Sequence, residues 1–143
     1  LWAAGDEPAA LFADPAEEYV FVQYICQFLN LFEMAYRFRK DDVVEREVFG
    51  SWVIWMWSLC EQRPFQHRWS ETDLPFNYVT EFRAVLSEGV CLAREAQKEP
   101  PGPVRDAALL AARRAFFEHV ANTLAGCPAV KGWLPPSPPS AAG

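Results

Sequence analysis

Hydrophobic residues recur along most of this chain with the three- and four-residue spacing of an α-helix. The first helical stretch opens on Asp14, which can cap a helix, and Pro15, which suits a first turn; Glu17 completes a capping box. Pro64 and the Pro-rich segment 99–103 interrupt the pattern, because proline cannot continue a helix. The long helical stretches cover residues 14–40, 43–62, 78–98 and 104–124, and a short one covers 65–71.

This succession of elements predicts an all-α fold. Four long helices with short connections favour an antiparallel bundle of four long helices, with the short helix packed across one end. Residues 1–13 are rich in alanine with little periodicity, so we expect a loose N-terminal arm. We expect residues 14–133 to form the bundle domain and residues 134–143, rich in Pro and Ser, to form a disordered tail.

The first helix is more apolar than a surface helix usually is. Its polar residues fall within one arc of about 120°, and the rest of its circumference is apolar, so we expect a central helix with neighbours on several sides. The polar residues of this arc are Gln23, Gln27, Asn30, Glu33 and Arg37. Asn30 and Glu33 either face solvent or form a buried hydrogen-bonded network that holds helices in register. A catalytic role for Glu33 would need a raised pKa.

The second helix carries Trp52, Trp55 and Trp57 among apolar residues that cover every side of it. At about 100° per residue, Trp52 and Trp55 share a broad face, which we expect to be the core face. Trp57 points elsewhere, near Ile54. We expect Ile54 and Trp57 to be exposed in an isolated bundle and to form an interface with a second copy, the proline-rich tail or another protein. The alternative is that this helix is central too and that its aromatic residues belong to the core.

Composition narrows the classes of function. The chain has 143 residues, a formal net charge of −6 and 51% hydrophobic residues, which fits one folded domain and disfavours nucleic-acid partners. The sequence has no run of about 20 apolar residues that would span a membrane. The four cysteines and two histidines lack metal-ligand spacing. We therefore expect no metal, no cofactor, reduced thiols and a cytoplasmic location.

Three short patterns resemble a known family. The segment 29–33 reads LN-x-x-E, the segment 64–69 reads P-x-x-x-x-W, and Phe82-Arg83 follows in the next helix. Across residues 18–90 they resemble a family of small bacterial all-helical proteins of unknown function, many of which carry an upstream membrane-anchoring helix. The resemblance implies an all-helical fold and a tether upstream of Leu1, and it implies no activity. Because the chain lacks an initial Met, we expect a fragment or a processed form.

The last helix carries Arg114 and His119 in R-x-x-x-x-H spacing, which resembles the active motif of the HEPN ribonucleases. In that family the arginine holds a phosphate and the histidine helps to move protons. Ala115 departs from the family, where a polar residue usually follows the arginine. Side chains five residues apart point about 140° apart on a straight helix, so one shared site would need a dimer. The alternative is an ordinary charged helix face.

The sequence therefore predicts a non-enzymatic helical protein-interaction or scaffold domain. Its partner would be another protein or a second copy of the chain. One alternative is a HEPN-type ribonuclease that uses Arg114 and His119. This alternative would be favoured if the two side chains clustered in a concave site. The other alternative is a small-ligand-binding domain with a pocket lined by tryptophans.

Overall fold

The computed structural model describes residues 12–124, and every regular element in that range is a helix, which confirms the predicted all-α class. The expected tail and most of the expected N-terminal arm lie outside the described residues. The predicted helix bounds differ from the observed ones by three residues or fewer. The elements are α1 (Pro15–Lys40), α2 (Arg46–Cys60), α3 (Arg63–Glu71), the 3-10 helix η2 (Leu74–Asn77), α4 (Thr80–Ala96) and α5 (Pro103–Thr123).

Local hydrogen bonds set both ends of α1. At its start, the Asp14 carboxylate accepts a hydrogen bond from the backbone N–H of Ala16 at 2.9 Å. At its end, the buried Arg39 guanidinium donates to the Asp42 carboxylate at 2.5 Å and to the backbone carbonyl of Val44. Asp42 has a φ of 59°, in the left-handed region that aspartate tolerates better than most residues. After this turn the chain reverses direction, and α2 runs antiparallel to α1.

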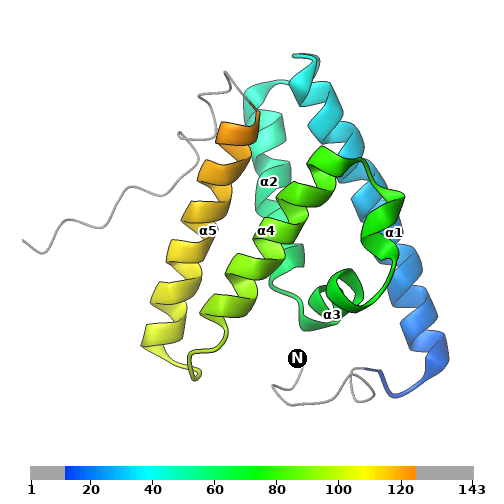
Figure 1. Cartoon of the computed structure of the whole chain (residues 1–143), viewed down its shortest axis with the longest axis vertical. Coiled ribbons are helices and arrows are strands. Elements are labelled where there is room, and N and C mark those ends of the chain that lie inside the picture. The colour runs from blue at the N-terminus through cyan, green and yellow to red at the C-terminus, as the bar shows by residue number, and fades with distance from the viewer. Residues whose placement is uncertain (1–11, 125–143) are drawn as a thin grey trace, which may run out of the picture.

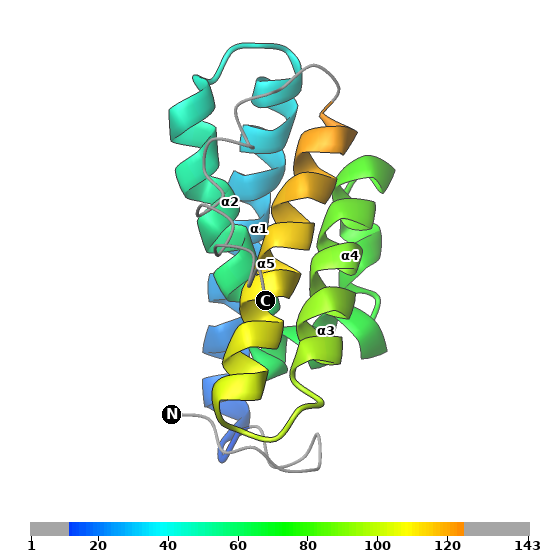
Figure 2. The same cartoon turned by 90° about the vertical axis from the view of Figure 1, so that its left-hand side faces the viewer.

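The helices form two antiparallel hairpins (Figures 1 and 2). The first is α1 with α2 and the second is α4 with α5, and α2 packs against both helices of the second hairpin. α3 and η2 lead the chain back to the end where α2 begins, so the neighbouring helices α2 and α4 run in the same direction. The predicted antiparallel arrangement of all four long helices therefore holds within each hairpin and not between α2 and α4. The N-terminal half of α1 diverges from α4 and α5 and is joined to α3 by an ion pair between Glu18 and Arg68.

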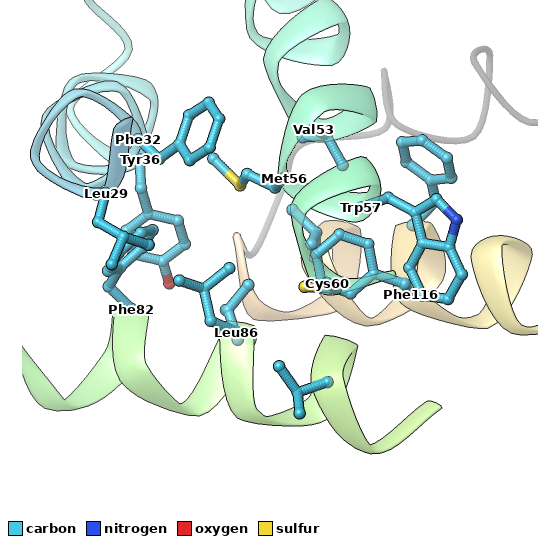
Figure 3. Close-up of a cluster of buried hydrophobic side chains, with 14 of the residues drawn as sticks. Leu29, Phe32, Tyr36, Val53, Met56, Trp57, Cys60, Phe82, Leu86 and Phe116 are labelled. Atoms are coloured by element: carbon cyan, nitrogen blue, oxygen red, sulfur yellow. The ribbon is translucent and has the colours of Figure 1, made fainter. Parts of the chain in front are cut away.

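The core lies where α2 meets the other long helices (Figure 3). Gly89 of α4 allows the closest approach, because a Cβ atom there would lie 2.7 Å from the Sγ of Cys60 and 2.8 Å from the ring of Phe116. The core residues labelled in the figure are Leu29, Phe32 and Tyr36 of α1; Val53, Met56, Trp57 and Cys60 of α2; Phe82 and Leu86 of α4; and Phe116 of α5.

The predicted orientation of α2 is wrong. Trp57 is only 3% exposed, and its ring centroid lies 5.7 Å from that of Phe116, so Trp57 belongs to the core and does not form an exposed pair with Ile54. Ile54 itself is 36% exposed. Trp55, expected in the core, is 59% exposed. α2 has two apolar stripes, and α4 and α5 cover the one that contains Val53 rather than the one that contains Trp55.

A buried amide network holds α3 against its neighbours. The Gln66 side-chain amide donates to the backbone carbonyl of Cys60 at 2.8 Å and to the side-chain oxygen of Gln97 at 2.9 Å. Gln97 in turn donates to the backbone carbonyl of Glu61 at 2.8 Å. Gln66 thereby satisfies a buried donor group and joins α3 to the ends of α2 and α4.

Candidate interaction surface on helices α1 and α2

The side of α1 that faces away from the core carries a regular row of exposed residues. Five of the six are apolar, and their spacings alternate between four and three, which is the seven-residue repeat of a coiled-coil seam. The row is about 27 Å long. The exposed fraction of its apolar side chains runs from 41% for Leu31 to 66% for Val20. The row is named the outer seam here and consists of Val20, Tyr24, Gln27, Leu31, Met34 and Phe38.

The opposite side of α1 packs into the core. Ile25, Leu29, Phe32 and Tyr36 are buried there. α1 therefore lies at the edge of the described structure, and the expectation of a central helix is wrong (Figure 1). The physical reason is that α1 has more apolar circumference than its neighbours cover, so one apolar side faces the core and the outer seam does not.

Two apolar hollows border the outer seam. The N-terminal hollow has a volume of about 580 Å³, and the central hollow, between α1 and α2, has a volume of about 250 Å³. Phe28 connects them, because its ring centroid lies 4.6 Å from that of Tyr24 and 6.1 Å from that of Trp55. The N-terminal hollow is lined by Phe12, Ala16, Glu17, Val20, Phe21 and Tyr24, and the central hollow by Phe28, Leu31, Phe32, Ser51, Trp52 and Trp55.

Within residues 12–124, this surface carries little charge. The outer seam contains no charged residue, and among the described residues that line the two hollows Glu17 is the charged one. On the side away from Phe28, the seam is flanked by the neutral side chains of Gln23 and Asn30 and by the charged side chain of Arg37, and all three are exposed. Phosphate recognition needs cations, and acid–base catalysis needs perturbed titratable groups. The surface is suited instead to apolar contact with a neutral partner.

Asn30 and Glu33 have different surroundings. Asn30 is exposed, so the hypothesis of a buried network is wrong for this residue. Glu33 is partly buried, and its carboxylate accepts a hydrogen bond from the backbone N–H of Val79 at 3.0 Å. Val79 is the N-cap residue of α4, so the Glu33 carboxylate lies at the positive end of that helix. Glu33 therefore ties α1 to the start of α4.

Arg114 and His119 are both partly buried on α5. The Nε2 atom of His119 is buried without a hydrogen-bond partner in the structure. The two residues lie on a different hairpin from the outer seam and its hollows, so the apolar surface and the ribonuclease hypothesis concern separate parts of the fold.

Burial raises the pKa of two titratable groups at the end of α2. It raises the pKa of the Glu61 carboxyl, although a hydrogen bond with Trp57 and the charge of Arg113 act in the opposite direction. Burial also raises the pKa of the Cys60 thiol, and the nearby charge of Glu61 adds to this. The Cys60 thiol therefore stays protonated at neutral pH and is a poor nucleophile.

The outer seam is not among the features predicted from the sequence, although its signal is present there. The alternating spacing from Val20 to Phe38 can be read directly from the residues. The sequence does not show which apolar side of α1 the remaining helices cover, because that depends on packing between distant segments. Gln27 also belongs both to the polar arc and to the outer seam, which hides the repeat.

No family model, curated protein or solved structure matches this chain. Among residues 12–124, none of the helices has the length and apolar character that crossing a membrane requires. Over the same residues, no three side chains of the His, Cys, Asp and Glu types are grouped as a metal site would need.

Proposed function

We propose that this chain is a helical protein-interaction domain that binds its partner through the outer seam and the adjacent face of α2. The outer seam itself carries the proposal. A regular row of exposed apolar residues over about 27 Å is unusual on a monomeric surface, where large apolar patches mark interaction sites. The alternating spacing further specifies a helix as the partner element, because such a row packs against another helix as knobs into holes.

The neighbouring aromatic side chains support the same function. Trp55 of α2 is 59% exposed beside Phe28, and aromatic residues are enriched in the buried centres of interfaces. Neutral hydrogen-bonding groups at Gln23 and Asn30 border the seam, which is the arrangement of an apolar centre with a polar rim. A helix docked between the outer seam and Trp55 would cover both.

A small-ligand site is the second candidate for the same surface. The central hollow is lined by Trp52 and Trp55, as the Trp-lined pocket hypothesis expects. Its volume of about 250 Å³ is smaller than that of most ligand pockets, which hold about 300–1,000 Å³ and bury most of the ligand. The continuity of the exposed row beyond this hollow favours a helix over a small molecule.

In-cell photo-crosslinking tests the interaction proposal. A photo-reactive amino acid placed at Gln27, within the outer seam, should form covalent adducts with protein in the cells from which the chain comes. The matched control is the same amino acid at Glu88, which is exposed on α4 and distant from the seam in sequence. Equal labelling from both positions, or adducts with lipid only, would contradict the proposal.

A further inference from the structure

We infer that the partner on this surface is a second copy of the chain, whose α1 lies antiparallel along the first. This inference rests on the proposed interaction function and adds the identity of the partner. Each copy would contribute its outer seam, and the two-fold axis would cross the row midway between Gln27 and Leu31. Such an interface is isologous, so one surface must complement itself.

The outer seam has this self-complementarity. When α1 pairs with an antiparallel copy of itself, Val20 lies opposite Phe38 of the other copy, and Tyr24 lies opposite Met34. Gln27 lies opposite Leu31, at the centre. All six seam positions therefore find a counterpart in the same register. Two of the three layers join a large apolar side chain to another apolar one, and a single polar position in a seam is a device that sets register and orientation.

The flanking residues also permit this pairing. On one side of the seam, antiparallel pairing brings Asn30 near Asn30 of the other copy and Gln23 near Arg37, so no like charges meet there. The net charge of −6 opposes the approach of two copies in general, so a face with little charge brings them together at the lowest electrostatic cost. Glu17 and Asp41 would approach each other at the two ends of the seam, so added salt should strengthen the dimer slightly.

The other side of the seam supplies room for the partner's side chains. Phe21 and Phe28 flank the seam there, one seven-residue repeat apart, and each lines one of the two hollows. Phe38 of the other copy, opposite Val20, would reach the N-terminal hollow. Trp55 would close the central part of the interface from α2. The dimer would therefore bury α1 between its own core and the second copy, as the apolar circumference of this helix requires.

Light scattering with a matched pair of variants tests the inference. The purified chain should have twice the mass of one chain at high micromolar concentration. Val20→Glu places a charge in the seam and should weaken the dimer by about ten- to hundred-fold, with the helical circular dichroism spectrum unchanged. Val104→Glu is the control, because Val104 is also near a helix start and is 64% exposed, against 66% for Val20. Leu31→Glu is a second seam variant.

Disulfide formation tests the orientation. In a background where Cys26, Cys91 and Cys127 are replaced by Ser, the double variant Val20→Cys/Phe38→Cys should form covalent dimers under mild oxidation. The two positions lie about 27 Å apart within one α1, so they cannot bond within a chain. Antiparallel pairing predicts little cross-linking of either single variant, whereas cross-linked single variants would show parallel helices and overturn the inferred geometry.

The possible results separate this inference from the proposed function. A purified chain that stays monomeric, together with crosslinks from position 27 to a different protein, would overturn the inference and leave the interaction function standing. A monomer without such crosslinks would overturn both. A dimer that Val20→Glu and Leu31→Glu leave intact would place the dimer interface elsewhere and overturn the inference.

Discussion

The α4–α5 hairpin and α1 use similar apolar residues in different ways. In the hairpin, Phe82, Leu86, Phe116 and Phe117 are fully buried, and the helices approach so closely that Gly89 has no room for a side chain. α1 buries one apolar side and leaves the outer seam exposed. The contrast shows that α1 has more apolar residues than the other described helices cover, and that the exposed ones follow a repeat suited to helix pairing.

The contrast between the two regions predicts very different effects for the same substitution. Phe116→Ala should lower the free energy of unfolding by about 3–5 kcal/mol, because it opens a cavity among α2, α4 and α5. Phe38→Ala, at a side chain that is 44% exposed, should cost less than about 1 kcal/mol in the monomer. Urea unfolding, carried out at protein concentrations too low for self-association, measures the free energy of unfolding of both variants. Similar losses for the two variants would show that α1 is not an open edge.

The close approach at Gly89 gives the next largest effect. The Cβ atom of Gly89→Ala would lie 2.7 Å from the Cys60 Sγ atom, so α2 and α4 must separate slightly. Overpacking a core costs about 1–3 kcal/mol, and the higher helix propensity of alanine offsets up to about 1 kcal/mol of that cost. We therefore expect a net loss of about 1–2 kcal/mol. Glu88→Ala is the control, because Glu88 is the adjacent residue and is exposed. Thermal unfolding of both variants decides. A melting temperature of Gly89→Ala above that of the unchanged chain, as helix propensity alone would give, would rule out the close approach of the helices at Gly89.

Glu33 joins the two regions, and its removal should have a smaller effect. Glu33→Gln removes the negative charge at the start of α4 and weakens the hydrogen bond from the Val79 N–H group. We expect a loss of about 0.5–1 kcal/mol, typical of a charge at a helix N-terminus. Glu88→Gln, in the middle of α4, should change stability very little. Chemical unfolding distinguishes the two variants, and equal effects would remove the capping role.

Much of the fold could be predicted from the sequence, because helix ends depend on nearby residues. Asp14 forms the expected cap, and Pro64 and Pro103 lie within the first turns of their helices. These signals act within a few residues, so they can be read from short stretches of sequence. The Gln66 network could not be predicted in this way, because its hydrogen-bond partners lie at the ends of α2 and α4.

The candidate interaction surface was harder to predict than the helix ends, because α1 and α2 each have two apolar sides. For α2, Trp55 and Trp57 are equally apolar, and the position of Phe116 decides that Trp57 is the buried one. For α1, the sequence likewise does not show which of its two apolar sides is buried, so it does not show that the outer seam is exposed. Helical periodicity finds apolar sides, but the choice between two of them depends on contacts between distant segments.

The smallest expected effect concerns Glu61, where α2 meets α5. Burial raises the pKa of Glu61 above its ordinary value of 4.5, so the folded chain binds this proton more tightly than the unfolded chain does. The ionised carboxyl therefore lowers stability above the folded-state pKa, and this cost disappears as the pH falls below about 4.5. Glu61→Gln removes the cost and keeps an acceptor for Trp57. We expect a gain below about 1 kcal/mol near neutral pH, because the group is only partly buried, and no gain in acid. Urea unfolding at the two pH values measures this, and a loss near neutral pH would show that attraction to Arg113 outweighs the burial.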